Sequence, residues 1–333
     1  MITFLSSPKP FKGNDKENQY RAIRSWLLTA ESVEVILYGD SLGIEEAGRE
    51  LGVQIVNNIQ SSSTGVPYFN AIVEHAAVQG KYDIQIYLNC DILLFGILSA
   101  LKLIQFQEFL LIGERIDMSE SALIDISETS WRNELRKLAD KGGVRLHGPT
   151  GIDYFAFRRG MWQGLPPVII GRAGYDNALL VYCMKNHYPI IDGTLSVLAL
   201  HQFHKYEHVV GGHETVFLGK EAFQNFAAVG SRHSATGVSD ASYILRGGRI
   251  SSWPCRGDRL RSLELEFCYV KGWQKLSLAL RLVWRLVTAY HLYRPIYFSL
   301  EQLLIEHECI SDAGNQREKG MDCTPRVGQN MLE

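Results

Sequence analysis

Two polar side chains interrupt the apolar run YDIQIYLNCDILLF, which spans residues 82–95. Asn89 and Asp91 lie two positions apart within it. A strand buried on both faces should not carry them, so they are either solvated at a strand end or hold a ligand. Mg²⁺ and Mn²⁺ prefer oxygen donors and often bridge one or two carboxylates to substrate phosphates. A capping aspartate beside a turn asparagine explains the pattern equally well.

A histidine-rich segment, HQFHKYEH, forms a second candidate. His201, His204 and His208 are three and four residues apart, a spacing that would share one face of a helix, and His213 follows. The H-E-x-x-H pattern of zinc proteases does not occur in the sequence, which disfavours that chemistry. A histidine is more often a packed or surface residue than a ligand, but one histidine of this segment that assists a metal or a diphosphate is more plausible than a zinc site.

Two aspartates follow glycines, Asp153 in PTGIDYF and Asp176 in GRAGYDN. Glycine permits close approach of the backbone to a ligand, and a carboxylate is a common general base for a hydroxyl group. A carboxylate at the start of a helix is also stabilised there without any catalytic role. For Asp176 both explanations stay open, whereas Asp153 is interpreted as part of a site.

The elements that must position these residues follow from the apolar pattern of the first half. Short apolar runs predict strands, and amphipathic patterns between them predict helices. The predicted strands are residues 2–5, 33–38, 53–56, 84–88 and 109–112, and the predicted helices are residues 18–29, 43–51, 68–79 and 96–105. Asn14 and Asp15 are expected to cap the first helix. This alternation predicts an α/β fold, a mainly parallel sheet with helices on both faces.

Parallel sheets of this kind bind ligands beyond the carboxyl ends of their strands, where residues 38–40 and 89–91 are expected. The second half has a looser pattern. A polar segment over residues 114–130 precedes a charged helix at 131–142, a loop at 142–151 and a strand at 152–160. A helix at 175–186 and strands starting at 188 and 196 follow.

Composition restricts the possible function of the 333 residues. The net charge of -2 gives no reason to expect binding to nucleic acid. Six dispersed cysteines without a C-x-x-C pair are typical of reduced thiols in a cytoplasmic protein. The N-terminal sequence does not have the pattern of a signal peptide, and the longest apolar run, residues 92–104, is shorter than the ~20 residues that cross a bilayer.

Six motifs in order resemble one family. FLSSPKPF, ILYGD, YLNCDILL, GPTGIDYFAF, GRAGYDNALL and LHQFHKYEH are similar to motifs of glycosyltransferase-like, mostly bacterial proteins with the GT-A fold, which is Rossmann-like and binds nucleotide sugars. The resemblance covers about residues 1–245. It implies transfer of a sugar from a nucleotide-sugar donor to a glycan or lipid-linked acceptor, in assembly of a surface polysaccharide.

The resemblance also implies roles for single residues. Asn89 and Asp91 stand where the family has its D-x-D motif for the cation and the diphosphate, and His201 stands where a late histidine completes the metal site. Asp176 corresponds to the catalytic base, and Asp153 is assigned to the catalytic residues with it. The remaining positions line the donor and acceptor pockets, and they are Pro8, Lys9, Asp40, Gly151 and Asp153.

Asn89 departs from the family pattern because it replaces the first acid. A single carboxylate, Asp91, must then hold Mg²⁺ or Mn²⁺, unless His201 or the diphosphate completes the shell. Lys9, Arg158, Arg159 or Arg172 could instead neutralise the departing diphosphate as a fixed cation. A catalytically silent binding or scaffold protein with the same fold is the alternative. A sugar nucleotidyltransferase is disfavoured because the first strand precedes no glycine-rich, lysine-bearing loop.

The predicted domain organisation has three parts. Residues 1–245 form the GT-A-like domain, with a nucleotide-binding half at 1–114 and an acceptor half at 131–245. Residues 246–311 form a helical extension, and residues 312–333 a disordered tail. Residues 271–294 predict an otherwise apolar helix with one polar stripe, formed by Ser277, Arg281, Arg285 and Thr288. The helix is therefore both apolar and basic. This helix either makes peripheral contact with the inner face of the plasma membrane or packs on protein.

Overall fold

The computed structural model describes residues 1–126, 131–204, 212–228 and 236–252 without gaps. It also describes positions 275–276, 279–280, 282–283, 303 and 307. The polar stripe predicted for residues 271–294 and the predicted tail at 312–333 lie outside the described residues. The division into domains stays a prediction.

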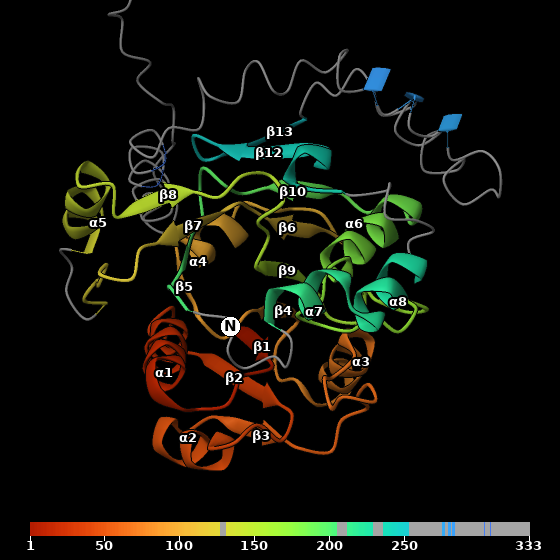
Figure 1. Ribbon diagram of the computed structural model, residues 1–333. Helices are drawn as coiled ribbons and strands as arrows, with labels where there is room; N and C mark the ends of the chain where they lie inside the picture. Colours follow the sequence, from red (N-terminus) through yellow and green to blue (C-terminus); the bar gives the residue numbers. More distant parts are fainter. Residues whose placement is uncertain are drawn as a thin grey trace, which may run out of the picture.

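A nine-stranded sheet forms the centre of the molecule (Figure 1). Its strand order is β13-β12-β10-β6-β9-β4-β1-β2-β3. The strands are β1 Ile2–Ser6, β2 Val33–Tyr38, β3 Gln54–Val56, β4 Ile84–Leu88, β6 Leu110–Ile112, β9 Tyr154–Arg158, β10 Ile190–Asp192, β12 Tyr243–Arg246 and β13 Arg249–Ser252. Strands β3, β2, β1 and β4 are parallel, and β9 is antiparallel to both of its neighbours. The predicted α/β fold with a mainly parallel sheet is confirmed.

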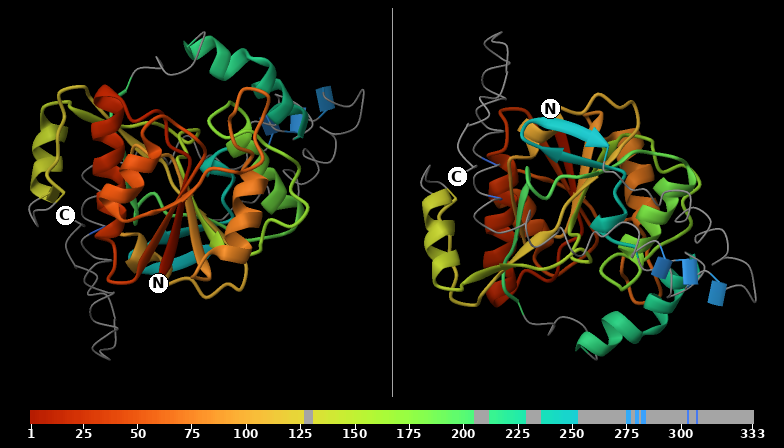
Figure 2. Two further views of the ribbon diagram at one scale, coloured as in Figure 1. Left: turned by 90° about the horizontal axis from the view of Figure 1, so that it is seen from below. Right: turned by 90° about the horizontal axis from the view of Figure 1, so that it is seen from above.

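Alternate residues of each strand pack against opposite faces of this sheet. Phe4 and Leu37 belong to one buried cluster, and their neighbours Leu5 and Tyr38 belong to the other. Helices α1 Gly13–Leu27 and α2 Ile44–Leu51 cover the first face, and α3 Phe69–Gln79 and α6 Tyr175–Lys185 cover the second. Figure 2 shows α1 and α3 on opposite sides of the strands. Both faces are therefore buried, which explains the near-continuous apolar strand sequences.

Helix α1 begins earlier than predicted. Lys12 is its extended N-cap residue and makes no side-chain capping bond, whereas Asp15 lies inside the first turn. The expectation that Asn14 and Asp15 cap the helix is therefore wrong. A carboxylate in the first turn still favours the helix through its dipole. The chain is fixed before this turn by a backbone bond from Phe11 to Leu42.

A second sheet of four strands was not predicted. Its order is β5-β11-β7-β8, and its strands are β5 Ile92–Phe95, β11 Leu198–His201, β7 Arg115–Met118 and β8 Val144–Leu146. Only β11 was expected. The segment that contains β7 reads as polar, and the segment that contains β8 reads as a loop. Each of these strands spans three or four residues and depends on pairing with distant segments, which local sequence does not reveal.

The remaining helices are short. They are α4 Ile97–Leu101, α5 Trp131–Asp140, α7 Gly212–Leu218, α8 Lys220–Ala228 and a 3-10 turn at Val238–Asp240. Helix α4 ends earlier than the predicted residue 105. Near the C-terminus, Leu303 is fully buried in the core, and the ring of His307 stacks edge-on against Trp131 at 5.6 Å between centroids. Among the described residues, no helix has the length and apolar character needed to cross a membrane.

Candidate functional site

Strand direction brings distant segments together at one edge of the large sheet. Strands β1 and β4 are parallel, so the residues after Ser6 and after Leu88 leave the sheet at the same edge. Strand β9 runs in the opposite direction, and Tyr154 pairs with Leu88. The start of β9 therefore lies at the same edge, and Asp153 reaches it without being close to residue 89 in sequence.

Asp91 is the centre of a charged cluster at this edge, and its side chain is only 4% exposed. Its Oδ2 atom lies 2.6 Å from Lys9 Nζ, 3.2 Å from His204 Nε2 and 3.8 Å from His201 Nε2. Burial alone would raise the pKa of this carboxyl. The charges of Lys9 and the two histidines together outweigh burial and hold the pKa well below its usual range. Asp91 is therefore an anion that neighbouring donors stabilise.

The same cluster has the donors of a metal site. One oxygen of Asp91 and one ring nitrogen each of His201 and His204 lie within 4.8 Å of one another. The other oxygen, Asp91 Oδ1, is buried and accepts no hydrogen bond from any described residue. A buried carboxylate oxygen without a partner is costly unless a cation occupies the space beside it. The residues present thus fit a divalent cation.

The histidines reach Asp91 from an extended segment. His201 is the last residue of β11 and pairs with Ile92, and residues 202–204 are not helical. His201 ends the strand predicted to start at residue 196, and His204 follows it in the histidine-rich segment, so these two histidines do not share the helical face that their spacing would allow. His208 lies outside the described residues. Burial lowers the pKa of His201, which favours the neutral ring that binds metals.

A second charged group centres on Arg115, in strand β7. Its Nε donates to Asp117 Oδ1 at 2.9 Å, and its Nη1 donates to Asp153 Oδ2 at 2.7 Å. Although burial opposes the charge, these carboxylates raise the pKa of Arg115. Burial also opposes the charge of Asp117, but bonds to His147 and Arg115 lower its pKa to about 2. Arg115 is therefore a cation held between two acidic side chains, and Asp117 is ionised at neutral pH.

Asn89 holds Asp153 from the other side. Its Nδ2 donates to Asp153 Oδ1 at 2.9 Å, and its backbone N–H donates to the Asp153 carbonyl at 3.1 Å. Both oxygens of the Asp153 carboxylate thus accept bonds, one from Asn89 and one from Arg115. The structure brings Asn89, Asp91 and Asp153 together, but Asn89 contacts Asp153 and is not a member of the metal-binding group.

Gly151 shapes the wall beside this group. A Cβ atom at residue 151 would lie 2.4 Å from Cδ2 of the His147 ring, so only glycine lets that ring pack here. The ring is fixed further by Asp117, whose Oδ2 lies 2.8 Å from His147 Nδ1. The Gly151 carbonyl accepts the N–H of Arg115 at 2.9 Å.

Asp176 lies in the first turn of α6 and is half-buried. Burial raises its pKa to about 6, and the negative charge of Asp153 adds to the rise, against bonds from Asn177 that lower it. Both the backbone N–H and the side-chain amide of Asn177 donate to Asp176 Oδ1 at 2.9 Å. The Asn177 amide oxygen in turn accepts the N–H of Thr236 at 2.6 Å. Asp176 is thus a positioned carboxylate with a pKa near neutrality.

The residues expected to contact a nucleotide lie beyond β1 and β2. Pro8 is buried, and its carbonyl accepts a bond from Ser41 Oγ at 2.6 Å. Lys9 is half-buried and joins this segment to Asp91. Asp40 is exposed just after the end of β2. These positions share one sheet edge, and their predicted contacts with a nucleotide stay a prediction.

Searches for relatives give matches among solved structures. No protein-family model matches the chain, and no curated protein sequence matches it significantly. Glucosyl-3-phosphoglycerate synthase from Mycobacterium tuberculosis, in complex with Mg²⁺ and UDP, is 14% identical over 68% of this chain and 77% of its own, with a TM-score of 0.39.

Two further solved structures match. The mannosyltransferase PcManGT from Pyrobaculum calidifontis, in complex with GDP-Man and Mn²⁺, is 11% identical over 96% of this chain and 88% of its own, with a TM-score of 0.43. A CMP:2-keto-3-deoxy-manno-octonic acid synthetase complexed with CTP is 15% identical over 61% of this chain and 88% of its own, with a TM-score of 0.32.

A cavity of about 460 Å³ opens beside the two charged groups, and we call it the site pocket. Strands β7, β8 and β11 supply half of its lining residues. Its lining residues are Arg115, Asp117, Met118, Ser119, Gly142, Gly143, Val144, Arg145, His147, His201, Phe203 and His204. The second sheet, which was not predicted, therefore supplies the walls of the cavity beside the metal-binding group.

Several residues of the site were missed in the sequence. Arg115 and Asp117 lie in the segment read as polar, and His147 lies in the predicted loop. His204 was considered with the other histidines, but only His201 was assigned to the metal. The alternation of Arg115 and Asp117 with buried Ile116 and Met118 was the available signal for a strand. Four residues are too few for that signal to stand out.

Proposed function

We propose that the chain transfers a sugar from a nucleotide-sugar donor to a hydroxyl of a glycan or lipid-linked acceptor, as in assembly of a surface polysaccharide. One observation supports this most. Lys9, Asp91, His201 and His204 gather cationic and metal-binding groups at the sheet edge where ligands of such sheets bind. The carboxylates Asp153 and Asp176 lie close enough for the charge of one to raise the pKa of the other.

The leaving group of this reaction is a nucleoside diphosphate, which must be stabilised as it takes up negative charge. Asp91, His201 and His204 would hold a divalent cation, and the bound cation would supply positive charge to the diphosphate. Two imidazoles and one carboxylate suit Mn²⁺ better than Mg²⁺, which prefers oxygen ligands. Lys9 adds a fixed ammonium group beside Asp91.

Asp176 is the proposed general base. As the acceptor oxygen bonds to the anomeric carbon, the bond from that carbon to the diphosphate breaks, and the diphosphate leaves with the electron pair. The hydroxyl proton moves to Asp176. A carboxyl with a pKa of about 6 is mostly ionised at pH 7 and is a stronger base than an ordinary carboxylate. Asn177 orients it through Oδ1.

Asn89 and Arg115 have positioning roles in this proposal. They hold the two oxygens of Asp153 and so fix the carboxylate whose charge acts on Asp176. Asn89 cannot offer a second carboxylate to the cation. Its amide holds Asp153, whose charge raises the pKa of Asp176.

A nucleotide-binding experiment with Asp91→Ala tests this function. Isothermal titration calorimetry with Mn²⁺ alone, and then with UDP, GDP or CDP, measures the affinity for the cation and the affinity for the nucleoside diphosphate. We expect the wild type to bind one diphosphate more tightly with Mn²⁺, and Asp91→Ala to weaken Mn²⁺ binding at least ~10-fold because a ligand is lost. Glu31→Ala, at an exposed acid, is the matched control. Equal Mn²⁺ affinity in wild type and Asp91→Ala would remove Asp91 from the metal site.

Asn89 in place of an acid favours one alternative, a nucleotide-binding protein without catalysis. The two functions differ in turnover. A protein that binds a nucleoside diphosphate but neither transfers nor hydrolyses the matching nucleotide sugar would support the silent alternative. Release of diphosphate that requires Asp176 would support the transferase.

A further inference from the structure

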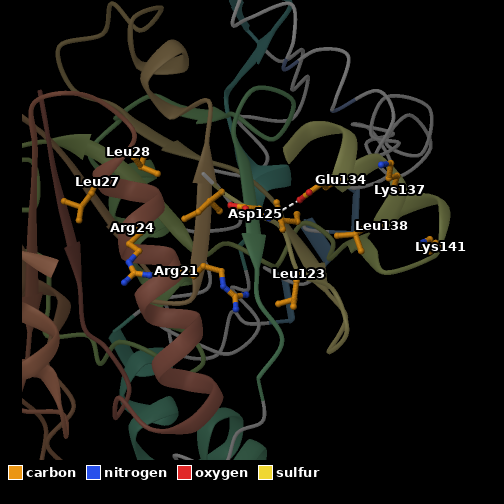
Figure 3. Close-up of a pocket in the computed structure, with 12 residues that line it drawn as sticks. Arg21, Arg24, Leu27, Leu28, Leu123, Asp125, Glu134, Lys137, Leu138 and Lys141 are labelled. Carbon is orange, nitrogen blue, oxygen red and sulfur yellow. Dashed lines mark hydrogen bonds between the residues drawn. The ribbon is translucent and has the colours of Figure 1, made fainter. Parts of the chain in front are cut away.

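A second cavity, of about 870 Å³, lies between helices α1 and α5, and we call it the α1–α5 groove (Figure 3). Its size is within the usual range of small-molecule sites. One wall is the C-terminal half of α1, the other is α5, and the segment 123–126 lies between them. The lining residues are Arg21, Arg24, Leu27, Leu28, Leu123, Ile124, Asp125, Ile126, Glu134, Lys137, Leu138 and Lys141.

Half of the lining residues are leucine or isoleucine, drawn from all three segments. Leu28 is 66% exposed and Leu123 is 65% exposed, so two large apolar side chains of this one cavity remain in contact with water. A single exposed leucine is ordinary, whereas several around one cavity indicate a surface that binds an apolar ligand. An apolar chain placed here would bury both leucines.

Basic side chains surround this apolar surface. Arg21 and Arg24 come from α1, and Lys137 and Lys141 come from α5 and the residue after its end. The opposing acids are Asp125 and Glu134, and Glu134 accepts the backbone N–H of Asp125 at 3.0 Å. Four cations against two carboxylates favour an anion. A ligand that is apolar at one end and anionic at the other is complementary to both features.

The groove adjoins the site pocket at two places. Lys141 lines the groove, and the next residues, Gly142 and Gly143, line the site pocket. At the other place, Arg21 NH1 donates to Gln202 Oε1 at 3.3 Å, and the following residue, Phe203, lines the pocket and is 40% exposed. A ligand that begins in the groove can therefore end beside the metal-binding group.

We infer that the α1–α5 groove binds the apolar chain of a phosphate-linked lipid acceptor. The basic side chains bind its phosphate, and its head group extends to the site pocket. The assignment of the head group rests on the proposed function, whereas binding of the chain and phosphate does not. The groove thus restricts the proposed acceptor, a glycan or a lipid-linked molecule, to an amphiphile with one anionic linkage.

Dodecyl phosphate, used below its micelle concentration, is the probe for this inference. Isothermal titration compares it with inorganic phosphate and with the neutral dodecyl glucoside. We expect dodecyl phosphate to bind at least ~10-fold more tightly than either, because only it satisfies both the apolar surface and the cations. Leu28→Ser with Leu123→Ser should weaken this binding ~10-fold. Val78→Ser, at a 77% exposed valine of α3, is the matched control and should leave it unchanged.

Three outcomes would overturn the inference. They are equal binding of dodecyl phosphate and inorganic phosphate, equal binding of the neutral glucoside, and full binding by the double leucine variant. Both substitutions are at exposed positions, and circular dichroism checks that the variant is folded. Failure of the proposed function has a different signature. If the proposed function is wrong, nucleotides do not bind in the presence of Mn²⁺, whereas dodecyl phosphate still binds as expected.

Discussion

The site pocket and the α1–α5 groove both contain arginines, but they use them differently. Arg115 in the pocket is bound by two carboxylates at 2.7 and 2.9 Å. In the groove, no described residue forms an ion pair with Arg24, Lys137 or Lys141. Paired, buried charges fix side chains in one geometry, which suits chemistry. Exposed cations beside leucines retain their capacity to bind, which suits recognition of a ligand.

The largest effect that separates the two regions concerns stability. Arg115→Met removes the only group that pairs Asp117 with Asp153 among the described residues, and it leaves two carboxylates close together. We expect a loss of about 3–5 kcal/mol in the free energy of unfolding, measured by urea denaturation at pH 7. Arg24→Met in the groove is the matched control and should change it by less than about 0.5 kcal/mol.

Equal losses for both arginines would contradict the comparison, because they would show that the groove arginine is as strongly coupled to the fold as Arg115. A small loss for Arg115→Met alone would mean that the carboxylates of the site pocket are solvated in the folded protein. Lowering the pH should reduce the cost of Arg115→Met. Asp117 has a folded pKa of about 2, so its paired charge contributes stability above its unfolded pKa and loses it as pH falls through the folded value.

The next effect is on catalysis. Asp176→Asn should leave donor binding unchanged and reduce the transfer rate ~10²-fold or more, about 2.7 kcal/mol of barrier, because an amide accepts no proton. Wild-type kcat/KM should rise with pH and level off above about 6, the pKa of Asp176, and the variant should lose this rise. Transfer by Asp176→Asn at the wild-type rate would mean that another group is the base.

The contrast also explains which parts of the molecule the sequence predicts. Strands β1, β2 and β4 are long apolar runs with the period of two, and their predicted bounds agree with the structure within one residue. Position 91 at a strand end follows from the same pattern. The sheet edge there is set by local sequence, so Asp91 and Lys9 could be placed together by the rule for parallel sheets.

The walls of both cavities depend on contacts that the sequence does not display. Strands β7 and β8 are short and pair with each other across about 25 residues, and β11 joins β7 from a later part of the chain. His204 reaches Asp91 only because β11 pairs with β5. The α1–α5 groove requires two helices that are remote in sequence to line one cavity. Leu27, Leu28 and Leu138 look like ordinary residues of predicted helices, and Leu123 lies in a segment read as polar.

The smallest expected effect is a difference in salt dependence between the α1–α5 groove and the site pocket. Three of the four basic side chains of the groove, Arg24, Lys137 and Lys141, are exposed, so added NaCl screens their attraction for a phosphate. The affinity for dodecyl phosphate should therefore fall ~3-fold between about 0.05 and 0.3 M NaCl. The ion pairs of Arg115 are short and mostly buried, and salt screens buried pairs much less. The stability difference between wild type and Arg115→Met should therefore stay constant over the same range. Binding of dodecyl phosphate that strengthens with salt would show that the apolar chain alone binds, and that the four basic side chains do not contact the phosphate.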